Sequence, residues 1–120
     1  MTPDNDADRL SHIEDAIDRI SRYANEVARA PGPPSGVIAD ALNDAVLYNL
    51  AVIGEAVKAL SDSVRDRDAD DLWRKFAGLR DILIHSYFRV DREAIDDVVT
   101  KHVPSLAQLV RDSRRRVNDE

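Results

Sequence analysis

The sequence contains no cysteine, so it has no disulfide framework, no thiolate metal site and no cysteine nucleophile. That composition agrees with a reducing cytosol. No uninterrupted apolar run approaches the roughly 20 residues that a membrane-spanning helix requires, and the chain starts with the polar, acidic segment MTPDND. We therefore expect a cytoplasmic protein with no membrane partner.

An excess of positive charge is also absent. Lys and Arg number 17 against 23 Asp and Glu, which gives a formal net charge of −6. This disfavours nonspecific nucleic-acid binding by a broadly basic surface, because that mode draws its affinity from many neutralised phosphates. Any contact with a nucleic acid must be local. Residues 111–116 (RDSRRR) are either such a local surface or a solvated helix end whose cations favour the C-terminal dipole.

The Glu-x-x-His pairs with which helical bundles hold two irons are missing as well. No glutamate is followed three residues later by a histidine, and His12 and His102 stand alone. We expect both histidines to be structural or surface residues. The sequence therefore predicts neither a metal site nor a cofactor.

What the chain does contain is helical periodicity almost throughout. Apolar residues recur at three-, four- and seven-residue spacing and predict one amphipathic helix over about residues 6–30. The segment 31–36 (PGPPSG) then forces a turn, since a helix interior does not tolerate this density of proline and glycine. A second helix is predicted over about 37–61, with an apolar face broad enough for burial on more than one side.

The second half of the chain continues this pattern. Residues 63–70 are expected to form a charged connection, and a third helix is predicted from Asp71 or Leu72 onward. Another helix is expected to begin at Asp91. A last one should begin near Pro104, because proline suits the first position of a helix.

Together these segments predict one all-α domain over residues 1–120, an up-and-down bundle of four to five helices with flexible ends at 1–5 and 117–120. Two residues within the second helix call for an explanation. Gly54 costs about 1 kcal/mol relative to alanine at such a position, so we expect it to mark a close helix crossing. Glu55 is a carboxylate on a strongly apolar helix, and we expect an arginine across the bundle to pair with it.

The most informative segment is residues 79–88 (LRDILIHSYF), which place a fixed cation, an imidazole and a phenol at the end of an apolar run. Arginine can donate hydrogen bonds to two phosphate oxygens at once, and histidine exchanges protons near neutral pH. Arg80 and His85 could therefore cut RNA without a metal.

The spacing of these residues constrains how they can meet. Five residues of straight helix correspond to a rise of about 7.5 Å and a rotation of about 140°, so one continuous helix would point Arg80 and His85 apart. Either the helix ends between them, or a second copy of the chain completes the site across a two-fold axis. Tyr87, seven residues from Arg80, is only about 20° out of line with it if the helix persists.

These residues resemble the signature of a known family. Arg80-x4-His85-x-Tyr87 is similar to the motif of HepT, a HEPN-domain ribonuclease toxin of prokaryotic toxin–antitoxin pairs. The resemblance covers about residues 9–110, with further matches at residues 50–56 (LAVIGEA), Trp73, 78–81 (GLRD) and 90–91 (VD).

The resemblance implies a HEPN-like homodimer whose two Arg-His sets face each other in an interface cleft and cleave RNA without a metal. RNA carries its own nucleophile, so the enzyme need only deprotonate the 2′-hydroxyl, stabilise the charged transition state and protonate the 5′-oxygen. We assign His85 to proton transfer and Arg80 to the phosphate oxygens. Asp81 either orients one of these two residues or forms a surface ion pair.

Tyr87 has two interpretations. The resemblance implies that the matching tyrosine receives AMP from ATP through the partner antitoxin MntA, a minimal nucleotidyltransferase. The added bulk and negative charge would silence the toxin by repelling the RNA backbone. The other interpretation is a tyrosine that packs its ring and hydrogen-bonds its hydroxyl.

A rival hypothesis makes the chain a non-catalytic helical dimer that docks a nucleotidyltransferase partner or a nucleotide. In that case the aromatic residues of the third helix and of the segment after it serve as core or interface anchors. The two hypotheses differ in whether purified protein degrades RNA in EDTA.

Overall fold

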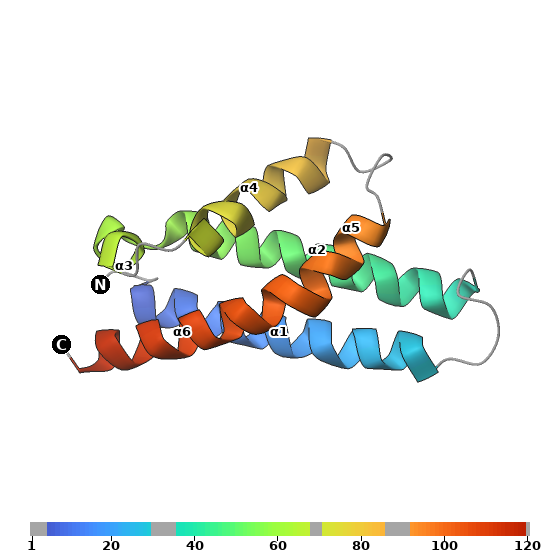
Figure 1. Ribbon diagram of the computed structural model, residues 1–120, viewed down its shortest axis with the longest axis horizontal. Helices are drawn as coiled ribbons and strands as arrows, with labels where there is room; N and C mark the ends of the chain where they lie inside the picture. Colours follow the sequence, from blue (N-terminus) through green and yellow to red (C-terminus); the bar gives the residue numbers. More distant parts are fainter. Residues whose placement is uncertain (1–4, 30–35, 68–70, 86–91, 120) are drawn as a thin grey trace.

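The computed structural model describes residues 5–29, 36–67, 71–85 and 92–119, and each element in these ranges is a helix (Figure 1). α1 and α2 form a long antiparallel pair. α1 spans Asp6–Arg29 and α2 spans Val37–Ala59, close to the predicted bounds.

The first turns of α2 and α1 are preceded by different structures. The turn predicted at 31–36 lies outside the described residues except for Gly36, which precedes α2 in an extended conformation. α1 starts with a side-chain cap, because Oδ1 of Asn5 accepts the backbone N–H of Asp8 at 2.9 Å.

α2 ends two residues before the predicted position because Leu60 is extended, with φ −64° and ψ 146°. A short helix, α3 (Asp62–Arg67), follows, so part of the charged connection predicted at 63–70 is helical. Oγ of Ser61 accepts the N–H of Val64 at 3.4 Å, and the Val64 side chain is buried in the core. With Val64 as its one apolar residue, α3 has no hydrophobic period that a sequence pattern could reveal.

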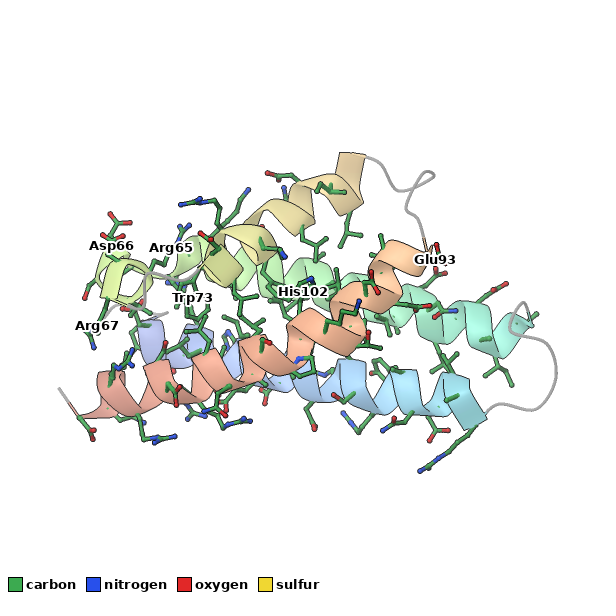
Figure 2. The ribbon with its side chains drawn as sticks, in the orientation of Figure 1. Arg65, Asp66, Arg67, Trp73, Glu93 and His102 are labelled. Atoms are coloured by element: carbon green, nitrogen blue, oxygen red, sulfur yellow. The ribbon has the colours of Figure 1, made fainter. Side chains whose placement is uncertain are left out.

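α4 spans Asp71–His85 and begins where the third helix was predicted. It packs against α2 and contributes Trp73, Phe76 and Leu83 to the core. Figure 2 shows Trp73 directed into the interior of the bundle, and this residue is only 2% exposed. The segment beyond His85 and the predicted start of the next helix at Asp91 lie outside the described residues.

The last three elements follow one another without a break: α5 (Arg92–Asp97), a π-helical turn η2 (Val98–His102) and α6 (Val103–Asn118). Two separate helices were predicted here. Pro104 lies in the first turn of α6, as expected. In an α-helix its ring would clash with the carbonyl four residues earlier, so the wider π-turn directly before it lets the chain continue as helix.

The helices alternate in direction. In Figure 1, α1 and α4 run from left to right, whereas α2 and the α5–α6 segment run back. If α5, η2 and α6 are counted as one continuous segment, the described residues form five helical segments, the upper end of the predicted range. The predicted all-α bundle is confirmed. The apolar residues that are 0% exposed come from four of these segments: Leu10, Ile13, Ala16, Ile20, Leu50, Ile53, Val57, Phe76, Leu106 and Val110.

The arginine cluster near the C-terminus is divided between several roles. Arg114 forms an ion pair with Glu14 and so fastens α6 to α1. Arg111 and Arg115 contact neighbours on their own helix, Gln108 and Asp112 respectively. These contacts favour a structural role for part of the cluster.

α2 is, by length and composition alone, long and apolar enough to cross a membrane, with a mean hydropathy of 1.4 over the relevant window. The core helix of a water-exposed bundle has the same property. Val46, Leu50, Ile53 and Val57 of α2 are buried against neighbouring helices, which accounts for part of its apolar character. The cytoplasmic location therefore stays a prediction.

Candidate active site

Arg80 lies where α4 crosses α2, directly over Gly54. A Cβ placed on Gly54 would lie 2.7 Å from the Cβ of Arg80 and 2.7 Å from the carbonyl oxygen of Phe76. Any larger residue would therefore push the two helices apart. The prediction that Gly54 marks a close helix crossing is confirmed, and the residue that this crossing brings against α2 is Arg80.

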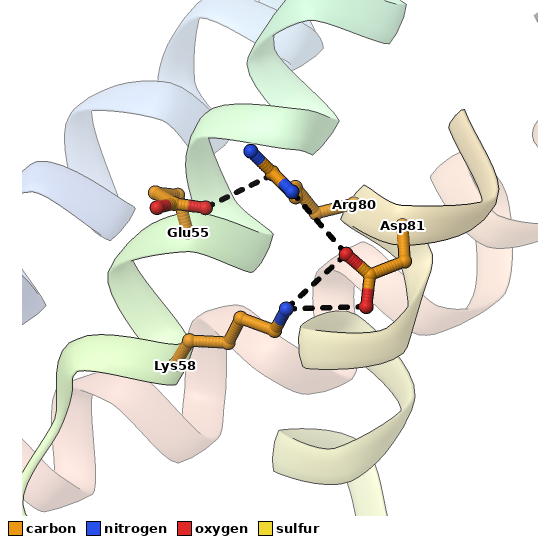
Figure 3. Close-up of polar contacts among 4 residues, drawn as sticks. All are labelled: Glu55, Lys58, Arg80 and Asp81. Carbon is orange, nitrogen blue, oxygen red and sulfur yellow. Dashed lines mark hydrogen bonds and ion pairs between the residues drawn. The ribbon is translucent and has the colours of Figure 1, made fainter. Parts of the chain in front are cut away.

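A chain of alternating charges surrounds this crossing (Figure 3). Nε of Arg80 lies 3.0 Å from Oε2 of Glu55, and Nη1 of Arg80 lies 3.3 Å from Oδ1 of Asp81. On the other side, Nζ of Lys58 donates to both carboxylate oxygens of Asp81, at 3.2 and 3.1 Å. We call these four residues the charge network. The expected arginine partner of Glu55 is thus Arg80 itself.

The charge network is accessible to solvent. The side chain of Arg80 is 34% exposed and that of Glu55 is 65% exposed. Ion pairs with this exposure contribute at most about 1 kcal/mol each, so an arriving phosphate can replace a carboxylate on the guanidinium. The four charges sum to zero, so any anion that binds Arg80 has to compete with Glu55 and Asp81 for its guanidinium.

The pKa of Asp81 is lowered from its usual 3.8, mainly by the hydrogen bond from Lys58 and next by the one from Arg80. Asp81 therefore stays ionised at neutral pH and keeps two cations beside it. Two roles were predicted for Asp81: orienting Arg80 or His85, and forming a surface ion pair. The structure shows ion pairs of Asp81 with Lys58 and with Arg80.

The backbone of α4 decides between the two routes by which Arg80 and His85 could meet. α4 is continuous from Asp71 to His85, so the helix does not end between the two residues. Their backbone positions are therefore about 140° apart around the helix axis, and completion by a second copy stays a prediction. The side chain of His85 and all of Tyr87 lie outside the described residues, so their roles stay predictions.

Lys58 is a member of the charge network that the sequence interpretation missed. It lies three residues after Glu55 and so belongs to the same face of α2, a spacing that could have indicated it. Its side chain is 42% exposed. Lys58 adds a second fixed cation beside Arg80.

The two isolated histidines lie apart from one another. His12 is exposed on α1, as expected, and His102 is half-buried in η2 with Nε2 3.4 Å from Nζ of Lys75. Within the described parts of the chain, no group of three His, Asp or Glu side chains is arranged to hold a metal ion.

Comparison with known proteins gives consistent results. The family model described as HepT-like, "Ribonuclease HepT-like", matches residues 13–112. A protein of Thermococcus cleftensis named "Probable ribonuclease HepT" is 33% identical over 104 residues, which cover 82% of this chain and 86% of that protein.

Two further relatives are longer than the region they share with this chain. A Methanocaldococcus jannaschii protein named "Gamma-glutamylcyclotransferase and putative RNase" is 35% identical over 101 residues, 84% of this chain and 44% of its own. A "Putative RNase" of Caldanaerobacter subterraneus subsp. tengcongensis is 38% identical over 71 residues, 59% of this chain and 63% of its own. The chain thus spans less than two thirds of either relative. No solved structure matches the chain.

Proposed function

Because the chain belongs to the HepT-like ribonuclease family, we propose that it is a metal-independent endoribonuclease and the toxin of a toxin–antitoxin pair. One observation carries the proposal. The close crossing at Gly54 fixes a partly exposed Arg80 on the same helix as His85, at the residue spacing of the family motif.

The proposed chemistry uses only groups of the protein and of RNA. A His85 imidazole takes the proton of the 2′-hydroxyl, and the 2′-oxygen attacks the adjacent phosphorus. The bond from phosphorus to the 5′-oxygen breaks, and the protonated His85 imidazole returns its proton to that oxygen through a water molecule. The products are a 2′,3′-cyclic phosphate and a 5′-hydroxyl. Arg80 stabilises the extra negative charge on the phosphate oxygens in the transition state.

The homodimer belongs to the same proposal. Ile82, between Arg80 and His85 in the sequence, is 58% exposed on α4, and Tyr48 of α2 is 70% exposed. Large apolar side chains in such positions lose contact with water when a second copy covers them. The 140° divergence within one helix supports the same arrangement, because a two-fold axis can bring Arg80 of one copy to His85 of the other.

The direct test is RNA cleavage in excess EDTA. We expect the wild-type protein to cleave single-stranded RNA, and Arg80→Ala and His85→Ala each to lower the rate by at least about 100-fold. Arg22→Ala and His102→Ala are matched controls, since both residues lie away from the charge network, and they should retain full activity. Helix content and dimer mass should not change in any variant.

Two outcomes would contradict the proposal. Cleavage that survives both Arg80→Ala and His85→Ala would remove the assigned chemistry. A pure wild-type dimer that leaves RNA intact would instead favour the non-catalytic dimer that docks a nucleotidyltransferase partner.

Silencing by AMP is the remaining part of the proposal. Incubation with ATP and the MntA-like nucleotidyltransferase antitoxin should add the mass of one AMP to Tyr87 and stop RNA cleavage. Tyr87→Phe should abolish the mass increase, whereas Tyr48→Phe, which alters a tyrosine that is 70% exposed, should not. AMP found on another residue, or modified protein that still cleaves RNA, would contradict this mode of silencing.

A further inference from the structure

A depression of about 330 Å³ lies between α1 and α2, beside the charge network. It is lined by Arg9 and His12 of α1 and by Val52, Glu55, Ala56 and Ala59 of α2. Glu55 belongs both to this lining and to the charge network, where it contacts Arg80 at 3.0 Å. A molecule in the depression would therefore lie next to whatever Arg80 binds.

The lining has the character of a site for a small planar ring. Val52, Ala56 and Ala59 provide a low apolar floor, and the volume is at the lower end of the roughly 300–1,000 Å³ typical of ligand pockets. At the rim, Nη1 of Arg9 donates to the carbonyl oxygen of Ala59 at 3.0 Å, which holds the guanidinium in place. Imidazole and guanidinium planes, such as those of His12 and Arg9, are surfaces on which unpaired bases stack.

Glu55 would interact differently with the base and with the phosphate of a nucleotide. Its carboxylate repels a phosphate but accepts a hydrogen bond from a base N–H, and a carboxylate has about four acceptor sites, so it can do so while paired with Arg80. The phosphate is attracted to Arg80 and Lys58 on the far side of Glu55. This division agrees with a protein of net charge −6, on which RNA contacts must be local.

From this arrangement we propose that the depression binds one nucleobase of single-stranded RNA, next to the phosphodiester held by Arg80. The inference rests on the proposed ribonuclease function and adds a subsite that influences which bond is cut. Arg9 and His12 stack on the base, Val52 and Ala56 form its apolar floor, and Glu55 accepts a hydrogen bond from its edge.

The test measures binding and cleavage separately. Binding is measured by fluorescence anisotropy with a 2′-fluoro RNA oligonucleotide, which lacks the nucleophile and cannot be cut, and cleavage sites are mapped on RNA of the same sequence. Ala56→Leu fills the apolar floor of the depression, and His12→Ala removes a stacking ring.

Glu55→Gln would not test the subsite alone, because Glu55 also contacts Arg80. Matched controls are Ala41→Leu, at an exposed position of α2, and His102→Ala.

We expect Ala56→Leu and His12→Ala each to weaken binding by about 5- to 100-fold, the loss of one stacked base, and to change the set of bonds cut. Both controls should bind within about twofold of wild type, a change far below that of one stacked base. Thermal unfolding identifies a variant that has lost its fold, and His12→Ala, at an exposed position, keeps the test valid if Ala56→Leu unfolds.

Unchanged affinity and an unchanged cleavage pattern in both variants, with wild-type protein that cleaves RNA, would overturn the subsite and leave the ribonuclease function intact. A wild-type protein that neither binds the 2′-fluoro oligonucleotide nor cleaves RNA would overturn both.

Discussion

Lys58 is the residue that most strongly lowers the pKa of Asp81, the carboxylate beside Arg80. Its amino group donates to both oxygens of Asp81, and this contact is the main cause of the lowered pKa of that carboxyl. We expect Lys58→Ala to raise the pKa of Asp81 toward 3.8, as followed by the carboxyl carbon in an NMR titration. Lys75→Ala, which removes a lysine elsewhere on the surface, should leave the pKa unchanged; an equal rise in both variants would contradict the assigned cause.

The sign of the accompanying stability effect follows from the direction of the shift. A carboxyl whose pKa is lower in the folded protein adds stability above its unfolded pKa, near 3.8, and that contribution is lost as the pH falls through the lowered folded value. Asp81→Asn should therefore destabilise the protein at pH 6 and lose this effect below the folded pKa. Urea unfolding at several pH values measures the difference. A destabilisation that is the same at every pH would show that lost packing, not charge, is responsible.

Some contacts of the charge network could be predicted from the sequence, and others could not. A carboxylate on an apolar helix predicted an arginine partner for Glu55, because an unpaired charge there is unfavourable. The identity of that arginine depended on the helix crossing, which sequence spacing does not give. Lys58 and the depression around His12 depend on the same packing of α1, α2 and α4.

The α2–α4 crossing depends on glycine at one position and not at another. Gly54→Ala gains about 1 kcal/mol of helix propensity, but its Cβ meets the fixed carbonyl of buried Phe76 at 2.7 Å. Overpacking of this kind costs about 1–3 kcal/mol, so we expect a net loss of up to about 2 kcal/mol and lower RNA cleavage as Arg80 moves. Urea unfolding and the cleavage assay measure the two effects.

Gly78→Ala is the matched control on α4. A Cβ at Gly78 meets nothing within 4 Å, so this variant should gain about 0.5–1 kcal/mol of stability from the restricted unfolded chain and the better helix former. Stabilisation by both substitutions would mean that the helices can move apart at Gly54 without cost, which contradicts a crossing that fixes Arg80.

The long helices were predictable, whereas the short elements were not. α1, α2 and α4 each repeat the apolar period over several turns, so their bounds follow closely from the sequence. α3 has one buried apolar residue and depends on the cap by Ser61, which is a weak local signal. The π-turn before Pro104 was missed because a proline pattern predicts a new helix start as readily as a wider turn in a continuing helix.

The arrangement of the whole molecule explains why one copy is expected to be insufficient. The bundle buries the apolar faces of α1, α2, α4 and α6 against one another. Arg80 is nevertheless held beside Glu55 while α4 continues straight to His85. The rotation between these residues could be calculated from the sequence. Only the structure shows that α4 is continuous, so the helix does not end between Arg80 and His85 in a way that would let them meet within one chain. We therefore propose that the imidazole that works with Arg80 comes from a second copy of the chain.

Mixing two inactive variants tests this composite site. If Arg80 of one copy works with His85 of the other, a dimer of one Arg80→Ala chain and one His85→Ala chain has one site with both residues intact and one with neither. Random exchange places half of all dimers in this mixed class, so an equimolar mixture should recover about one quarter of wild-type RNA cleavage.

The controls should show no cleavage. Each variant alone should stay inactive, and a mixture of Arg80→Ala with the Arg80→Ala, His85→Ala double variant should recover nothing. An equimolar mixture that stays inactive after verified subunit exchange would instead require both residues from one chain, and α4 would then have to unwind between them when RNA binds.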